Sequence, residues 1–513
     1  MNLLPVLLFA LLFNVHTSWA AQSDSELLQE IQSTTDASAQ AKLYKVLGDR
    51  YVTQDKYDLA ADAFANALAL GRDLFSATQR VQMAVYLSWA DRLRESEREL
   101  RAVLARDPKN LQARTHLARV LSWSGELSEA VAEADKVLKE SPENRDALLI
   151  KADAFLWKGR ATQAAQIYQP LATKGDDFDA RVGLAHVYLA TGNRLAAEQA
   201  AAQLNASSFP QQRELDKLNT EIFKATRPTL DTRYLYYRDS DDNHYNRYIA
   251  QFGFWIQNLN LAVNYRHTDA DQDGHSRNRA EDLSLSLYSR VTDTVRIGGG
   301  MGFNQLSDGK TTHFPIGHVK IDADFLNGTI GAQVTREVLS DTTQLIKSGL
   351  RVTAAGVQAA QAITDRLSVS PGYTFKTYSD GNHAHDAQLT IPYTLFFDPK
   401  ISVGYRFRYL NFARQSGSGL FDPNDYFSNR LFSSFYAQKQ KYYAYAEAYI
   451  GQQSFRRTGV HVDDLVYGGA ASFGLTPTRH LTIEVYGEGG NLASGSAAGF
   501  TYFMAGPRII FRF

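Results

Sequence analysis

The chain has 513 residues, more than a single hydrophobic core normally organises, so two or more domains are expected. Its net charge of −1 argues against a nucleic-acid-binding protein, which needs a strongly basic face. The chain contains no cysteine, which excludes disulfides, thiolate catalysis and thiolate metal sites.

The N-terminus is typical of a secretory signal peptide, residues 1–20. Residues 3–13, LLPVLLFALLF, form an apolar run that is too short to span a bilayer as a helix. A small-x-small pattern follows and predicts cleavage after Ala20, although the usual basic residues before the run are missing. The alternative is a buried hydrophobic helix. A secreted chain without later helical spans either stays soluble or enters a membrane as a barrel.

Residues 41–204 carry a helical pattern that repeats. Its markers are Pro108 and Pro142, and Gly125, Gly159 and Gly192. Their spacing resembles the tetratricopeptide (TPR) repeat, in which about 34 residues form two antiparallel helices. About five repeats fit, and residues 211–226 are expected to form a polar capping helix. Residues 21–226 are therefore interpreted as a TPR superhelix that binds partners and carries no chemistry.

Two repeats depart from the usual pattern. Ser96 stands where a small apolar residue is expected, and Asp176 stands where proline is common. Near Ser96, the charged residues Arg98 and Glu99 are interpreted as part of a solvated face, because charged side chains are seldom buried.

From residue 227 to residue 513 the apolar pattern changes its period from 3.6 to 2, which predicts strands. Sixteen strand candidates follow one another: 229–238, 247–257, 260–268, 281–291, 294–304, 315–325, 328–337, 349–363, 367–378, 385–397, 401–413, 426–438, 442–455, 465–475, 481–490 and 499–513. Short links alternate with longer polar ones such as SDDNHYN, LSDGKTTH and QSGSGLFDPN. This alternation is typical of outer-membrane barrels with tight periplasmic turns and longer external loops, and it places the repeats in the periplasm.

The two faces of each strand differ in polarity. Residues 401–409 alternate apolar side chains, such as Val403, with Arg406 and Arg408, and Ile483 alternates with Glu484 in the same way. Sixteen strands enclose a lumen wide enough to hydrate such charges. Tyrosines near strand ends suit a membrane interface: Tyr234, Tyr236, Tyr265, Tyr373, Tyr393 and Tyr442. We predict an α + β multidomain protein, with an N-terminal TPR α-solenoid and a C-terminal 16-stranded antiparallel transmembrane β-barrel at 227–513; a soluble fold with each strand turned over is the alternative.

The polar faces of the strands supply candidates for lining the lumen. Charged side chains can set the charge preference of a pore, and aromatic rings can stack on sugars. The candidates are Arg233, Arg266, Arg290, Arg296, Lys320, Asp322, Asp324, Lys376, Arg406, Arg408, Arg430, Tyr443, Tyr445, Glu447, Tyr449, Glu484, Tyr486, Glu488, Arg508 and Arg512. The final strand carries Phe511 and Phe513, and its last residue resembles the C-terminal signal read by the outer-membrane barrel assembly machinery.

Catalytic and metal sites are not expected. His383 and His385 fall in an expected external loop, and the segment from Asp269 to Glu281 lacks the carboxylate that a calcium loop needs at its twelfth position. The serines of the strands show no hydrolase motif. We therefore expect no enzyme activity and no cofactor.

The order of signal peptide, TPR array and sixteen-strand barrel resembles outer-membrane porins that export exopolysaccharides such as poly-N-acetylglucosamine and cellulose. The resemblance is sharpest at residues 421–438, FDPNDYFSNRLFSSFYAQ, and it includes residues 336–351. It implies a bacterial outer-membrane location with the TPR domain in the periplasm. The implied partners are outer-membrane lipid, the exported polysaccharide and a periplasmic protein bound by the repeats, without nucleic acid.

Two other interpretations stay open at this point. TPR repeats before a barrel also resemble the surface-lipoprotein assembly modulators, which translocate proteins across the outer membrane. A third possibility is a phage-receptor or architectural barrel whose repeats recruit a partner.

Overall fold

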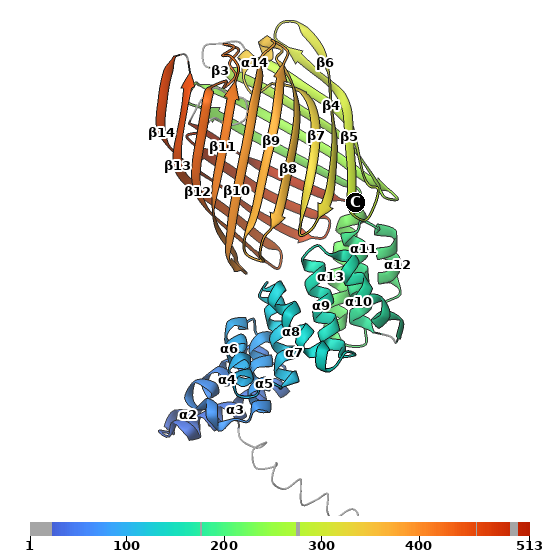
Figure 1. The fold of residues 1–513 in the computed structure, drawn as a ribbon, viewed down its shortest axis with the longest axis vertical. Helices are drawn as coiled ribbons and strands as arrows, with labels where there is room; N and C mark the ends of the chain where they lie inside the picture. Colours follow the sequence, from blue (N-terminus) through green and yellow to red (C-terminus); the bar gives the residue numbers. More distant parts are fainter. Residues whose placement is uncertain (1–22, 175–176, 273–276, 458, 493–500) are drawn as a thin grey trace, which may run out of the picture. The chain divides into compact units, whose positions relative to one another are not determined.

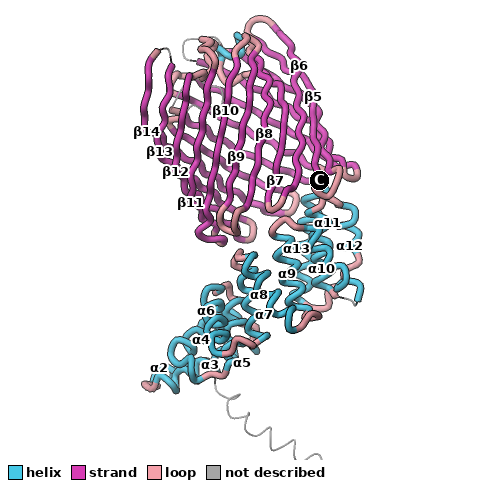
Figure 2. The backbone as a smooth tube through the Cα atoms, viewed as in Figure 1, coloured by secondary structure: helices cyan, strands magenta, loops and turns pink. Residues whose placement is uncertain are grey.

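The computed structural model describes residues 23–174, 177–272, 277–457, 459–492 and 501–513 (Figures 1 and 2). The expected signal peptide and its cleavage site at Ala20 lie outside the described residues. The chain divides into two compact units, Met1–Ala154 and Phe155–Phe513, so the last helices group with the strands that follow them. None of the helices in the described part of the chain is long and apolar enough to cross a membrane.

The N-terminal region is helical, as predicted. A first helix that the sequence analysis did not identify, α2 (Asp24–Ser33), precedes five helix pairs. The pairs are α3 (Ala37–Thr53) with α4 (Tyr57–Gly71), α5 (Ala77–Trp89) with α6 (Leu93–Arg106), α7 (Leu111–Trp123) with α8 (Leu127–Glu140), α9 (Arg145–Trp157) with α10 (Ala161–Lys174), and α11 (Phe178–Ala190) with α12 (Arg194–Ala202). A short 3-10 helix, η1 (Arg72–Leu74), follows α4, and α13 (Phe209–Thr226) ends the region.

The turn inside each helix pair uses one residue in the left-handed backbone conformation. Gly125, Gly159 and Gly192 hold it with φ of 83°, 75° and 75°. Asp55 and Asp91 hold the same place in the first two pairs, with φ of 57° and 61°. Glycine adopts this conformation without strain and aspartate tolerates it, so the glycine register of the sequence marks a real turn position.

Glu99 of α6 corrects the prediction of a solvated face. Its side chain is only 2% exposed and forms an ion pair with the buried Arg80 of α5. Arg72 of η1 adds a second pair, with 2.8 Å between its Nε and Oε2 of Glu99. Ser96 is also buried and donates a hydrogen bond to the carbonyl oxygen of Ala84 at 2.6 Å. A local pattern cannot show that the neighbouring helices bring two arginines to Glu99.

Replacing Glu99 tests this buried pair. Glu99→Ala leaves Arg80 buried without a counter-charge, which costs about 3 kcal/mol of folding free energy. We expect a lower midpoint for the loss of helical circular dichroism in urea, measured on the full chain in detergent. Glu97→Ala is the control, because Glu97 forms a more exposed pair with Arg101 and should cost less than about 0.5 kcal/mol. Equal effects of the two substitutions would contradict the assignment.

The C-terminal region is a closed antiparallel barrel, which confirms the predicted fold class (Figure 1). Its sixteen strands are β1 (Thr229–Asp239), β2 (Asn243–Ile256), β3 (Leu259–Gln272), β4 (Asn278–Arg290), β5 (Val295–Ser307), β6 (Thr311–Phe325), β7 (Gly328–Val338), β8 (Arg351–Ala362), β9 (Ser368–Tyr378), β10 (His383–Phe397), β11 (Lys400–Phe412), β12 (Asn424–Lys439), β13 (Tyr442–Arg457), β14 (Val460–Thr478), β15 (Leu481–Gly490) and β16 (Tyr502–Arg512). Each strand pairs with its neighbour in sequence, and β16 closes the ring on β1, with Arg508 opposite Arg233.

Several expected external loops are shorter than the sequence indicated. The links β1–β2, β5–β6 and β9–β10 comprise only residues 240–242, 308–310 and 379–382, because the strands continue into the polar segments. Backbone pairing does not require apolar side chains, so the strands extend beyond the part that carries the apolar face. Two longer links remain among the described residues of this end, 339–350 and 413–423, and the first contains a helix, α14 (Thr343–Ser348).

The outer face of the barrel is apolar. Val319 of β6 is 63% exposed and Leu285 of β4 is 52% exposed, and they alternate with inward positions such as Lys320 and Asp282. Tyr265, Tyr373, Tyr393 and Tyr442 are among the exposed aromatic residues. A closed ring of paired strands with a continuous exposed apolar face is typical of transmembrane β-barrels.

Spin labels test this orientation. Because the chain has no cysteine, Ile483→Cys and Glu484→Cys each give one labelling site, on opposite faces of β15. In lipid vesicles we expect the label at residue 483 to be accessible to oxygen and shielded from a water-soluble nickel complex. The label at residue 484 should show the reverse. Shielding of residue 483 from lipid would contradict the membrane barrel.

Candidate functional site

The predicted lining residues all lie on strands, at positions that alternate with the apolar residues of the outer face. By strand they are Arg233 (β1), Arg266 (β3), Arg290 (β4), Arg296 (β5), Lys320, Asp322 and Asp324 (β6), Lys376 (β9), Arg406 and Arg408 (β11), Arg430 (β12), Tyr443, Tyr445, Glu447 and Tyr449 (β13), Glu484, Tyr486 and Glu488 (β15), and Arg508 and Arg512 (β16). Their role in transport stays a prediction.

Three carboxylates of this inner face each lie beside two cations. Asp231 pairs with Arg233 and Arg508 at 3.0 and 2.6 Å, Asp386 with Lys376 and Arg408 at 2.8 and 2.9 Å, and Asp324 with Arg296 and Arg290 at 2.7 and 3.8 Å. Arg233 lies on the same strand as Asp231, whereas the remaining partners come from other strands and meet their carboxylate through the register of the sheet. Further carboxylates lie near two of the clusters: Glu484 is opposite Arg508, and Glu337 lines one cavity with Lys376 and Arg408.

Other polar groups of the inner face are largely paired. Arg406 donates to both carboxylate oxygens of Glu447 at 3.0 and 3.3 Å, and Tyr443 donates to Glu484 at 2.6 Å. Arg430 lies over the ring of Tyr449, 5.2 Å from its centroid, and its Nε has no hydrogen-bond partner among the described residues. The inner face therefore combines fixed ion pairs with a few arginine groups that can still donate.

The link 339–350, which we call the α14 plug, lies against the inner face at the end of the barrel that also carries the link 413–423, the upper end in Figure 1. Its Asp341 pairs with Arg247 of β2 at 2.7 Å. Asn278 of β4 donates to the carbonyl oxygen of Thr343 at 3.2 Å. Gln344 donates to the carbonyl oxygen of Gly417, in the link 413–423, at 2.9 Å.

Two apolar clusters fix the α14 plug. Leu345 belongs to a cluster with inward residues of β8 to β13, and Ile346 belongs to a second cluster with inward residues of β1 to β5. Both side chains are almost fully buried. The α14 plug therefore packs against the inner face at this end of the barrel, beside a cavity of about 400 Å³ that Asp341 and Asp386 help to line, and sequence reasoning missed this arrangement. The sequence carried only a short signal for the helix α14. Thr342 caps its N-terminus, and Gly349, with φ of 58°, follows its C-terminus.

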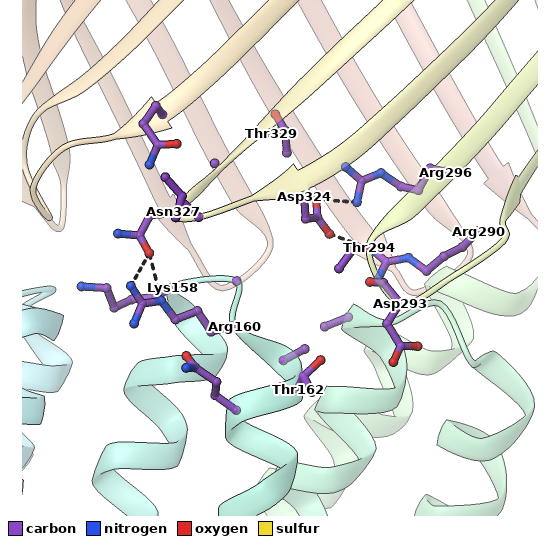
Figure 3. Close-up of a pocket in the computed structure, with 17 residues that line it drawn as sticks. Lys158, Arg160, Thr162, Arg290, Asp293, Thr294, Arg296, Asp324, Asn327 and Thr329 are labelled. Carbon is purple, nitrogen blue, oxygen red and sulfur yellow. Dashed lines mark hydrogen bonds and ion pairs between the residues drawn. The ribbon is translucent and has the colours of Figure 1, made fainter.

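The other end of the barrel carries a pocket of about 880 Å³, shown in Figure 3. The turn between α9 and α10 forms one side of it, and the β4–β5 and β6–β7 turns form the other. We call this cavity the mouth pocket. Sequence analysis predicted Arg290, Arg296 and Asp324 of its lining but missed Lys158 and Arg160, because those two lie in the helical region.

Side chains of the helices hold them to the barrel turns. Lys158 pairs with Asp365 of the β8–β9 turn at 2.9 Å, and Arg160 donates to the side-chain oxygen of Asn327. The guanidinium of Arg194 in α12 lies 3.2 Å from the ring centroid of Trp255, and burial is the main cause of its lowered pKa. These contacts fix the helical wall of the mouth pocket.

The described histidine and carboxylate side chains include several from the two segments that the sequence raised as candidate metal sites. Among them, no group of three or more His, Asp or Glu is placed to hold a metal ion. The expected external loop at His383 is instead the start of β10, and His385 Nδ1 lies 2.7 Å from the hydroxyl of Tyr373. In the segment that resembles a calcium loop, Asp269 pairs with Arg277 and Arg279, while residues 273–276 lie outside the described residues.

Comparisons with known proteins identify the repeats of the helical region. Residues 90–153 match the tetratricopeptide repeat family. No curated protein sequence matches the chain. Similar solved structures include a bacterial polysaccharide outer membrane secretin, which is 12% identical with a TM-score of 0.45 and covers 55% of this chain and 98% of its own.

Two further solved structures are similar to parts of this chain. CdiB from Acinetobacter baumannii is 10% identical with a TM-score of 0.36, over 56% of this chain and 60% of that chain. A tetratricopeptide repeat protein from Parabacteroides merdae is 16% identical with a TM-score of 0.34, over 39% of this chain and 77% of that chain. At these values the likeness does not determine a function.

Loosening the α14 plug tests whether it closes the barrel. Asp341→Asn removes the charge that pairs with Arg247, and Leu345→Ser together with Ile346→Ser weakens both apolar clusters. We expect the single variant and the double variant to raise single-channel conductance in planar bilayers several-fold over the wild type. Asp308→Asn, in the exposed β5–β6 turn, is the matched control and should leave conductance unchanged. Wild-type conductance in all variants would show that the plug does not limit the path.

Proposed function

We propose that this protein is an outer-membrane channel that exports an exopolysaccharide from the periplasm to the cell surface. One observation carries the proposal: a closed sixteen-strand barrel presents apolar side chains outward and charged, amide and tyrosine side chains inward. A barrel of this strand number leaves room for an aqueous channel. A hydrated lumen can pass a hydroxyl-rich polymer without breaking bonds.

The inner face supplies the groups that such a polymer needs. Hydroxyl groups of sugars lose water contacts in the channel, and ionic and hydroxyl side chains replace those contacts. Tyr443, Tyr445 and Tyr449 project from alternate positions of β13, where their rings can stack on sugar rings. The repeating arrangement along one strand suits a chain that slides, because successive sugars meet similar groups. Polymer synthesis at the inner membrane supplies the force, and no cofactor or catalytic step is needed.

The helical repeats serve as the periplasmic part of the exporter. Helix pairs of the TPR type form binding surfaces for protein partners. We place this region in the periplasm, where it recruits a partner or guides the polymer to the mouth pocket. The outward side chains of Phe511 and Phe513 lie at the end of β16, where the assembly machinery would recognise the last strand.

A deletion strain tests the export function. Complementation with the wild-type chain should restore surface polysaccharide, measured by sugar analysis of the shed and cell-bound material. The triple variant Tyr443→Ala, Tyr445→Ala and Tyr449→Ala should lower the exported amount several-fold, because it removes the stacking groups. Heat-modifiable migration in gels monitors the amount of folded barrel, which should be unchanged.

The same strains separate export from protein translocation. Surface lipoproteins are measured by protease accessibility on intact cells. Loss of surface lipoproteins with unchanged polysaccharide would contradict the proposal and support a translocator. Loss of neither would support a receptor or architectural barrel.

A further inference from the structure

We infer that the mouth pocket binds acidic sugars, so that the exported polymer carries carboxylate groups. The inference rests on the proposed function and names the class of its substrate. It follows from the charges of the pocket, from the partners of those charges, and from the kinds of polar group between them.

The lining of the mouth pocket has an excess of positive charge. It contains the cations Lys158, Arg160, Arg290 and Arg296, and the carboxylates Asp293 and Asp324. Asp365, which is not part of the lining, pairs with Lys158 and reduces the excess from two charges to one. A cavity with this balance favours an anionic group over a neutral or a cationic one.

Arg160 is the cation best placed to bind an anion. Its guanidinium donates to the neutral amide oxygen of Asn327 and lies 5.9 Å from the ring centroid of Phe155. Neither partner carries a charge, so the positive charge of Arg160 is not balanced by these contacts. A guanidinium has five N–H donors in a planar fork that matches a carboxylate, and Arg160 uses its Nε and Nη2 toward one oxygen.

Arg290 and Arg296 approach from the barrel side of the same cavity (Figure 3). Arg296 is held close to Asp324 at 2.7 Å, whereas Arg290 lies 3.8 Å from it and donates to the carbonyl oxygen of Asp293 at 2.7 Å. The single carboxylate of Asp324 thus lies beside the guanidinium groups of both Arg290 and Arg296. An acidic sugar at this point would lie between cations of the helical turn and cations of the strands.

The remaining polar lining suits the hydroxyl groups of a sugar. It consists of Thr162, Gln163, Thr294, Asn327, Thr329 and Gln361. Hydroxyl and amide groups donate and accept hydrogen bonds, as sugar hydroxyl groups do. No aromatic residue is part of this lining, so recognition here depends on charge and hydrogen bonds instead of stacking.

Ion-pair clusters also lie farther along the inner face, where further carboxylates accompany the cations: Glu484 lies opposite Arg508, and Glu337 lines one cavity with Lys376 and Arg408. The cluster of Asp324 belongs to the mouth pocket, and the clusters of Asp231 and Asp386 likewise place two cations beside a shared carboxylate on other strands. Arginine and lysine side chains at several places let a carboxylate of an acidic polymer leave one cation as it reaches the next cation.

Binding of defined hexasaccharides tests the inference independently of channel opening. The full chain in detergent is titrated calorimetrically with a hexagalacturonate, with cellohexaose and with a hexamer of glucosamine. At low salt we expect the hexagalacturonate to bind at least ~10-fold more tightly than the other two, with an affinity that falls as salt rises. Similar affinities for the three hexamers would overturn the inference.

Substitutions locate the site. Arg160→Gln and Arg290→Gln should each lower hexagalacturonate affinity ~10-fold, because each removes a charge-assisted hydrogen bond. Lys310→Gln removes the same charge from the exposed β5–β6 turn and should change nothing. Heat-modifiable migration confirms that each variant is folded. Unchanged affinity in both arginine variants would place the binding elsewhere and overturn the inference.

Two further outcomes separate the inference from the function on which it rests. Hexaglutamate that binds as tightly, and with the same dependence on Arg160, would contradict recognition of a sugar. If the deletion strain loses surface polysaccharide but the chain shows no preference for hexagalacturonate, only the present inference fails. If binding is as expected but deletion leaves polysaccharide export intact, the proposed function fails.

Discussion

The closure of β16 on β1 is the constraint on which the rest of the barrel depends. A strand in hydrocarbon has no water to satisfy its N–H and C=O groups, so every edge must be paired. The first strand, residues 229–239, pairs with the last strand, residues 502–512, and this pairing leaves no free strand edge in the barrel. Closure also separates an outside from an inside. Because side chains alternate along each strand, the apolar side chains then lie on the outside of the barrel and the charged side chains lie on the inside.

The charged side chains of the inner face are held in clusters and are not isolated. Isolated charges would create strong fields inside the barrel. Each cluster with two cations fixes its side chains through a shared carboxylate, and further carboxylates such as Glu484 lie nearby. The mouth pocket extends this arrangement into the helical region through Lys158 and Arg160, whose contacts with Asp365 and Asn327 also attach the helices to the barrel turns.

The two ends of the barrel differ in kind. The end with the mouth pocket has a polar lining that includes residues of the α9–α10 turn, whereas at the opposite end Leu345 and Ile346 make apolar contacts with the inner face. Polar contacts, such as the ion pair of Asp341 with Arg247, also hold the α14 plug there.

Sequence by itself determined the helical repeats, the strand number and the alternation of apolar and charged faces along the strands, because these follow from local periods of 3.6 and 2 and from turn glycines such as Gly125. Tertiary structure alone decided which charges meet: Arg508 and Asp231 are joined by barrel closure, and Glu99 is buried by helices that bring Arg80 and Arg72 to it. It also decided that 339–350 folds against the inner face, since a six-residue helix has too short a pattern to detect. Periodicity is a property of neighbours in sequence, whereas ion pairs, plugs and pockets depend on register and on contacts between distant segments.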